Sequence, residues 1–172
     1  MKQYYLIAFI FITLNSFSQG SRECACCSEN HKAFDFWIGE WVVNYKSGGK
    51  AGVNLISKNQ DNCVISEQWT GINGKYTGMS TNFYNPETKQ WEQLWIDNQG
   101  QFLKLSGDFD DGKMVLTSEE SIDKQGNQSI NKITWFKNSD GTVRQLWEIV
   151  KSNGEILVAF DGIYTKKDTS DN

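Results

Sequence analysis

The chain has 172 residues, with 17 Lys and Arg against 21 Asp and Glu and a formal net charge of −4 at pH 7. This length suits one domain with a single core, and a mild acidic excess without a basic tract excludes a strong electrostatic binder of nucleic acid. One Pro, 15 Gly and 13% aromatic residues exclude a collagen-like repeat and a disordered chain. The single histidine excludes most histidine-based catalysis.

Residues 1–18 have the pattern of a secretory signal peptide. A basic start is followed by an apolar run over 4–14, and Ser16 and Ser18 supply the small residues that a cleavage site needs. Because the run is shorter than the roughly 20 residues that cross a bilayer, we expect export to the periplasm or outside the cell, and no transmembrane segment. A buried first strand and a lipoprotein attached at Cys24 are the alternative interpretations.

The four cysteines all follow this leader, and an oxidising compartment favours disulfides. The adjacent Cys26 and Cys27 do not suit a bond to each other, because it would strain the peptide. We predict that Cys63 pairs with Cys27, with Cys24 and Cys26 as alternatives, and that the bond contributes about 3–4 kcal/mol. A soft-metal site of Cys24, Cys26, Cys27 and His31 is the weaker alternative, because the spacing lacks the two-residue gap of zinc knuckles.

Residues 19–37 form a cysteine-containing N-terminal segment that is expected to end in a short helical turn over 28–37. Ser28 is a suitable N-cap, and Phe34 and Trp37 contribute to an apolar face.

From Gly39 to Lys166 the pattern changes to alternation of period two, with turn residues at about ten-residue spacing. This spacing leaves no room for crossover helices, so the strands are expected to be antiparallel. The predicted strands are 39–46, 51–58, 63–70, 75–84, 90–97, 101–108, 113–118, 128–136, 142–150 and 155–165. We assign 38–166 to one β domain and 167–172 to a disordered tail.

About ten meandering strands would expose two edges if the sheet stayed flat, and closure removes those edges. The sequence therefore predicts an all-β fold, a closed antiparallel up-and-down β-barrel. A barrel of this size holds either a side-chain core or a cavity for one small ligand. A two-sheet sandwich is the alternative, but the short connections disfavour it.

Side chains alternate between the two faces of a strand, so parity predicts which of them share the interior. Glu67 shares a face with Trp69, and Gln93 lies between Trp91 and Trp95. Polar groups buried among indoles need hydrogen-bond partners from the wall, from water or from a ligand. The predicted ligand-binding residues are Trp41, Tyr45, Glu67, Trp69, Ser80, Asn82, Tyr84, Gln93, Trp95, Arg144 and Trp147.

The same side chains also fit a filled core. In that alternative, Glu67 and Arg144 form a structural ion pair across the interior, and no ligand is involved.

The segment Phe36-Trp37-Ile38-Gly39-Glu40-Trp41 resembles the opening of lipocalins and their calycin relatives. In lipocalins this Trp closes one end of the barrel and an Arg from a late strand packs across it, which implies these roles for Trp41 and Arg144, in cation–π contact. The ten strands are more similar to nitrobindin and fatty-acid-binding barrels than to eight-stranded lipocalins. Nitrobindins carry haem on a barrel histidine, and this chain has no histidine after His31, so we expect no haem or other cofactor.

Residues 25–166 also resemble an uncharacterised family of exported bacterial proteins that is common in Bacteroidetes. The shared features lie at 34–41, Cys63, Glu67 with Trp69, 78–84, 90–97, 133–135, 143–148 and 160–164. This resemblance implies an exported barrel and does not imply an activity.

Three functions follow from these patterns. The first is an exported barrel that binds a small amphipathic or aromatic molecule, because apolar walls with a few polar anchors are typical of small-molecule sites. The second is a structural or interaction protein of the envelope with a side-chain-filled barrel. The third is an enzyme in which Glu67 acts as a general base because burial raises its pKa.

Overall fold

The computed structural model describes residues 24–167. The predicted signal peptide, residues 1–18, and residues 168–172 of the predicted tail lie outside this part of the chain. The elements in chain order are α1 (Glu29–Lys32), η1 (Asp35–Trp37), β1 (Gly39–Tyr45), β2 (Lys50–Asn59), β3 (Val64–Gly71), β4 (Thr77–Asn85), β5 (Gln90–Asp97), β6 (Phe102–Asp110), β7 (Lys113–Thr117), β8 (Ser121–Ile122), β9 (Gln128–Lys137), β10 (Val143–Lys151) and β11 (Ile156–Lys166).

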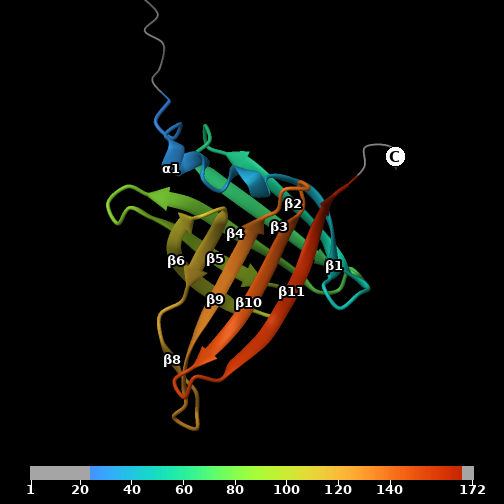
Figure 1. The fold of residues 1–172 in the computed structure, drawn as a ribbon, viewed down its shortest axis with the longest axis vertical. Helices are drawn as coiled ribbons and strands as arrows, with labels where there is room; N and C mark the ends of the chain where they lie inside the picture. The colour runs from blue at the N-terminus through green and yellow to red at the C-terminus, as the bar shows by residue number, and fades with distance from the viewer. Residues whose placement is uncertain (1–23, 168–172) are drawn as a thin grey trace, which may run out of the picture.

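Ten of these strands form a closed antiparallel barrel, which confirms the predicted fold (Figure 1). Neighbours in sequence are neighbours in the sheet, and the ring closes where β1 pairs with β11, with Val43 opposite Tyr164. The two-residue β8, which the sequence did not predict, pairs with the start of β9. The β8–β9 hairpin extends beyond the barrel. Each of the ten predicted strands is present with boundaries close to those expected.

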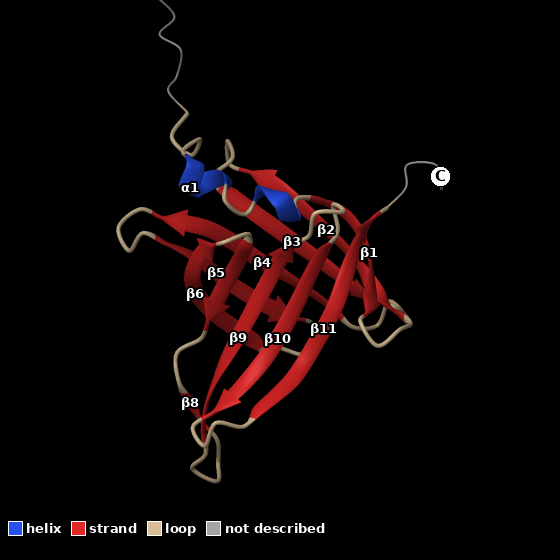
Figure 2. Cartoon of the chain, viewed as in Figure 1, coloured by secondary structure: helices blue, strands red, loops and turns tan. Residues whose placement is uncertain are grey.

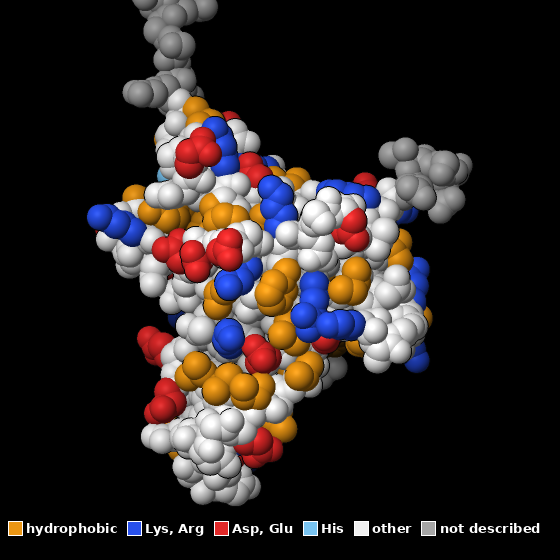
Figure 3. Space-filling view, in the orientation of Figure 1, with side chains coloured by type: hydrophobic (Ala, Val, Ile, Leu, Met, Phe, Trp, Pro, Cys, Tyr) orange, Lys and Arg blue, Asp and Glu red, His pale blue; other side chains and the backbone are white. Residues whose placement is uncertain are grey.

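The helices are confined to one end of the barrel (Figure 2). Ser28 caps α1 as predicted, because its hydroxyl accepts a hydrogen bond from the backbone N–H of His31. Among residues 24–167, no helix has the length and apolar character that a membrane span requires. On the face drawn in Figure 3, acidic, basic and apolar side chains are interspersed.

The N-terminal segment closes the barrel at this end with aromatic side chains. Phe34 and Trp37 are fully buried and stack with their ring centroids 4.9 Å apart, while Phe34 meets Trp135 edge-on at 5.2 Å. The indole N–H of Trp41 donates to the carbonyl of Trp37 at 2.8 Å. Such aromatic contacts contribute about 0.5–1.5 kcal/mol each beyond the apolar area they bury, so this end of the barrel is a packed core.

Lys166, and not Arg144, lies across Trp41. The Lys166 ammonium is 3.9 Å from the ring centroid and donates to the carbonyl of Ile38. Gly39 leaves room for it, because a Cβ at that position would lie 2.0 Å from the ammonium nitrogen. The predicted Arg144–Trp41 contact is wrong, because Arg144 has the parity of the outer surface of β10.

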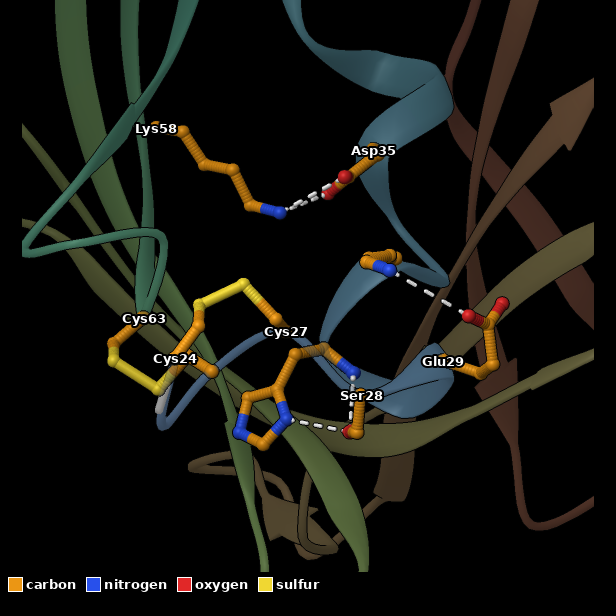
Figure 4. Close-up of a disulfide and its surroundings, with 10 residues drawn as sticks. Cys24, Cys27, Ser28, Glu29, Asp35, Lys58 and Cys63 are labelled. Carbon is orange, nitrogen blue, oxygen red and sulfur yellow. Dashed lines mark hydrogen bonds and ion pairs between the residues drawn. A yellow bond between two sulfur atoms is a disulfide. The ribbon is translucent and has the colours of Figure 1, made fainter. Parts of the chain in front are cut away.

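One disulfide lies within the N-terminal segment, and a second joins this segment to the barrel (Figure 4). Cys26 is bonded to Cys63 with the Cα atoms 5.0 Å apart, and Cys24 to Cys27 with the Cα atoms 5.4 Å apart. The predicted Cys27–Cys63 bond is therefore wrong. A tight turn over 24–27 brings Cys27 back onto Cys24 and leaves Cys26 to meet the chain entering β3.

The alternative soft-metal site loses its thiolate ligands, because all four cysteines are oxidised. Nδ1 of His31 lies 2.7 Å from the Ser28 hydroxyl. An ion pair between Asp35 of η1 and Lys58 of β2, at 2.6 Å, gives the segment a further link to the barrel wall (Figure 4).

Candidate functional site

The barrel interior contains a cavity of about 380 Å³ at the end opposite α1. Its mouth is formed by Tyr45 at the end of β1 and by Ile72 and Tyr76 in the β3–β4 turn, all of which are exposed. Its inner end is formed by buried polar side chains. The lining residues are Tyr45, Ala51, Glu67, Trp69, Gly71, Ile72, Asn73, Tyr76, Gln93, Trp95, Leu103, Ile133, Trp135, Gln145, Trp147, Ala159, Phe160 and Tyr164.

The wall of the cavity is aromatic. Trp69 of β3, Trp95 of β5, Trp147 of β10 and Phe160 of β11 are only half-buried although they point into the barrel. Phe160 meets Trp69 edge-on with the ring centroids 6.2 Å apart and meets Tyr45 in the same way at 5.9 Å. The indole N–H of Trp147 donates to Asn131 at 2.9 Å, which fixes the ring.

Glycines in the strands let these rings lie against the wall. A Cβ at Gly78 would be 2.1 Å from the ring of Trp95, and one at Gly52 would be 2.9 Å from the ring of Trp69. A Cβ at Gly162 would be 2.5 Å from the ring of Phe160. A strand glycine commonly marks such a close approach. Here the absence of a Cβ at three glycines lets three rings lie against the wall, so that they occupy less of the cavity.

Glu67 is the charged side chain at the inner end of the cavity, and it is 4% exposed. Its two oxygens each accept a short hydrogen bond: Oε1 from the amide of Asn54 at 2.7 Å and Oε2 from the hydroxyl of Ser80 at 2.6 Å. These partners come from the strands on either side of β3, so the local pairing of the sheet positions the carboxylate.

A chain of hydrogen bonds leads from Gln93 to this carboxylate. The amide of Gln93 donates to Asn82 Oδ1 at 2.6 Å, and Asn82 donates to Ser80 Oγ at 2.9 Å and to the carbonyl of Ile65 at 3.0 Å. Since the Ser80 hydroxyl accepts from Asn82, its own proton is directed to Glu67. The hydrogen bonds from Gln93 through Asn82 and Ser80 therefore all run toward the acidic group, and the second bond of the Asn82 amide goes to Ile65.

A second polar group borders Glu67 from β11 and β10. The amide of Asn54 lies 3.4 Å from the Tyr164 hydroxyl, and that hydroxyl donates to Gln145 Oε1. Burial, and to a smaller extent the charge of Glu67, raises the pKa of Tyr164 well above its ordinary value, so Tyr164 stays a neutral donor at physiological pH.

Burial raises the pKa of Glu67 from 4.5 to about 7, against the opposing effect of the hydrogen bonds from Ser80 and Asn54. The group is thus divided between its neutral and ionised forms near neutral pH. A positive charge brought into the cavity would favour the ionised form.

At the mouth, a hydrogen bond joins Tyr76 in the β3–β4 turn to Asp97 at the end of β5. The Tyr76 hydroxyl donates to Asp97 Oδ2 at 3.1 Å, while Oδ1 of Asp97 accepts from the backbone N–H groups of Gln99 and Gln101, at 2.9 Å each. The turn that follows β5 thus fixes Asp97, and Asp97 holds Tyr76 at the edge of the cavity.

The cavity brings together only part of the predicted set. Tyr45, Glu67, Trp69, Gln93, Trp95 and Trp147 line it. Ser80 and Asn82 point inward but lie behind Glu67 and Gln93, where they support the polar chain. Trp41 and Tyr84 belong to the closed end, where the Tyr84 hydroxyl accepts from Asn30 at 3.0 Å and its ring meets that of His31 at 5.1 Å.

Arg144 lies on the outside of the barrel, so the predicted ion pair with Glu67 is wrong. Its guanidinium makes two hydrogen bonds to Asp161, at 2.7 and 2.9 Å, and lies 5.4 Å from the centroid of the Phe136 ring. The pairing lowers the pKa of Asp161. The interior keeps its carboxylate without a basic partner among the residues that line the cavity.

Asn54, Gln145, Phe160 and Tyr164 complete the site and were not predicted as part of it. For Gln145, Phe160 and Tyr164 the parity of their strands was an available signal, since each shares a face with a predicted or buried aromatic residue. Asn54 had no such signal, because Val53 and Leu55 on the outer face of β2 are as apolar as its buried face.

Comparison of the chain with protein-family models and with curated proteins finds no match. The function is therefore inferred from the geometry of the cavity.

Proposed function

We propose that this protein binds a small amphipathic or aromatic molecule inside its barrel, at the open end. The observation that carries the proposal is the cavity of about 380 Å³, walled by Trp69, Trp95, Trp147 and Phe160, with hydrogen-bonding groups at its inner end. Small-molecule sites have this form and range from about 300 to 1,000 Å³. A side-chain-filled barrel would leave no such cavity among these rings.

We also propose that the protein is exported and that the mature chain begins after Ser18. Support comes from the apolar leader and from the two disulfides, since disulfides persist in oxidising compartments. N-terminal sequencing of the protein from its host tests this: a mature chain that starts at Gln19 is expected, and an intact Met1 in the cytoplasmic fraction would contradict it.

The binding proposal is tested by titrating the protein with small indoles, lipids and tetrapyrroles while recording tryptophan emission. A saturable change with at least one small aromatic compound is expected, because four indoles line the cavity. A second titration uses Trp147→Leu, which is expected to weaken binding roughly tenfold.

The matched control is Phe83→Leu, a similar truncation on the outer face of β4, where Phe83 is 36% exposed. It is expected to bind like the wild type. Binding that survives Trp147→Leu unchanged, or an absence of binding with every compound, would refute the proposed site.

A further inference from the structure

The cavity has an unbalanced charge. Glu67 is the one charged side chain among the described residues that line it, and the lining includes no lysine or arginine. Arg144, the basic residue expected there, is held by Asp161 on the outer surface, and Lys166 is held at Trp41 at the closed end. A buried ionised carboxylate without a cationic partner is costly.

The protein nevertheless orients its dipoles toward a negative charge at this point. Asn54 and Ser80 donate to the two oxygens of Glu67, and the amides of Asn82 and Gln93 continue the donor direction behind Ser80. Hydrogen bonds to the charged form of a carboxylate favour that form. The side chains around Glu67 therefore suit an ionised group whose balancing charge comes from outside the protein.

The aromatic wall beside Glu67 also suits a cation. Trp69, Trp95 and Trp147 line the same cavity as the carboxylate, and the face of an indole is the strongest cation–π partner among the side chains. Gly52 and Gly78 leave room for two of these rings to lie against the wall. The rings therefore need little rearrangement when a ligand enters.

We infer that the ligand is a monovalent organic ammonium ion, whose charged nitrogen faces Glu67 and whose apolar body lies among Trp69, Trp95 and Trp147. This inference rests on the proposed function and names the chemical class of the bound molecule. An anionic ligand such as a fatty acid would bring a second negative charge to Glu67 with no basic group to receive it. A neutral apolar ligand would bring no positive charge to balance an ionised Glu67, toward which the donors of the polar chain are oriented.

The pH dependence of binding follows from the same geometry. An ammonium ion favours the ionised form of Glu67 and lowers its pKa from about 7. The other titratable groups that face Glu67 are the phenols of Tyr76 and Tyr164, and burial raises the pKa of both above the ordinary value of 10.0. Glu67 is therefore the group of this set that titrates between pH 5.5 and 8.

The test compares phenyltrimethylammonium with tert-butylbenzene, which differ by the replacement of N⁺ by carbon. At pH 8, calorimetric titration of the full-length protein is expected to give roughly tenfold or greater preference for the ammonium probe. That preference is expected to disappear in Glu67→Gln, which still binds tert-butylbenzene and thereby reports an intact cavity. The matched control is Glu40→Gln, which removes the same charge from a side chain that is 62% exposed on β1 and is expected to keep the preference.

Equal or tighter binding of tert-butylbenzene by the wild type at pH 8 would overturn the inference and leave the proposed function standing. Binding of neither probe would remove both. If Glu67→Gln does not fold, the wild type still decides the matter: between pH 8 and 5.5 the preference for the ammonium probe is expected to fall roughly tenfold as Glu67 is protonated. A preference that does not change with pH would overturn the inference.

Discussion

Glu67 is the ionisable side chain on which the proposed binding chemistry depends. It lies at the inner end of the cavity, it accepts from Asn54 and Ser80, and burial raises its pKa to about 7. Sequence parity alone predicted its burial, because it is two residues from Trp69. Parity also places Arg144 on the opposite face to Trp147, and the mistaken ion pair came from matching opposite charges instead of following that alternation.

The raised pKa of Glu67 predicts a pH-dependent stability. In the unfolded chain the carboxyl titrates near 4.5 and in the folded protein near 7, so between these values the folded state binds more protons. The free energy of unfolding therefore falls as pH rises from about 4.5 to 7, by about 3 kcal/mol at most. Chemical denaturation at several pH values measures this loss.

The Glu67→Gln variant isolates this contribution because it cannot titrate. Its free energy of unfolding is expected to change less than that of the wild type across the same window. Parallel pH curves for the two proteins would show that Glu67 titrates at its ordinary value, and would contradict the burial described here.

At the scale of single elements, the strand glycines are as important as the aromatic residues they face. Gly78→Ala puts a methyl group 2.1 Å from an atom of the Trp95 ring, so the indole must move into the cavity. We expect a loss of about 1–3 kcal/mol in stability and weaker binding of phenyltrimethylammonium, measured by thermal unfolding and calorimetry. Thr81→Ala, on the outer face of the same strand, is the control; a Gly78→Ala variant that matches it in both measurements would refute this role.

The two disulfides are predicted to differ in their effect. The Cys26–Cys63 bond closes a loop with a sequence separation of 37, whereas Cys24–Cys27 closes one of 3. In the chain-entropy model the long loop contributes about 4 kcal/mol and the short one about 2 kcal/mol. The double variant Cys26→Ala/Cys63→Ala is therefore expected to unfold at a lower denaturant concentration than Cys24→Ala/Cys27→Ala, and the reverse order would contradict the pairing.

The elements themselves were largely predictable from the sequence. The alternation and the turn residues such as Ser139-Asp140-Gly141 depend on local backbone preferences, which a sequence displays directly. The cysteine pairing was not predictable, because it depends on how the turn over 24–27 meets the chain before β3. The glycine–aromatic contacts depend on register between strands, which the sequence does not display.

At the scale of the whole molecule, the barrel has two unlike ends. Phe34, Trp37 and Trp41 fill one of them, and the cavity opens at the other. Closure of the sheet was predictable, because an open sheet of this length would expose two edges. Whether the interior would be filled or hollow was not predictable. The alternation places the rings on a common face, but it does not show how they pack there.

Closure of the barrel predicts a pattern of amide exchange. Where β1 and β11 pair, the backbone N–H groups of each strand donate to carbonyls of the other, so these N–H groups are expected to exchange as slowly as those of β3 and β4. Hydrogen–deuterium exchange followed by mass spectrometry measures this. Rapid exchange along β1 and β11, with slow exchange elsewhere, would indicate an open sheet.

The most direct test of the hollow, indole-lined interior is nuclear Overhauser spectroscopy on protein with isotope-labelled tryptophan, in the presence of phenyltrimethylammonium. Contacts from the probe to the ring protons of Trp69, Trp95 and Trp147 are expected, and none to Trp37 or Trp41. Contacts confined to exposed outer residues such as Met79, or no contacts with any indole at saturating probe, would contradict an interior binding site.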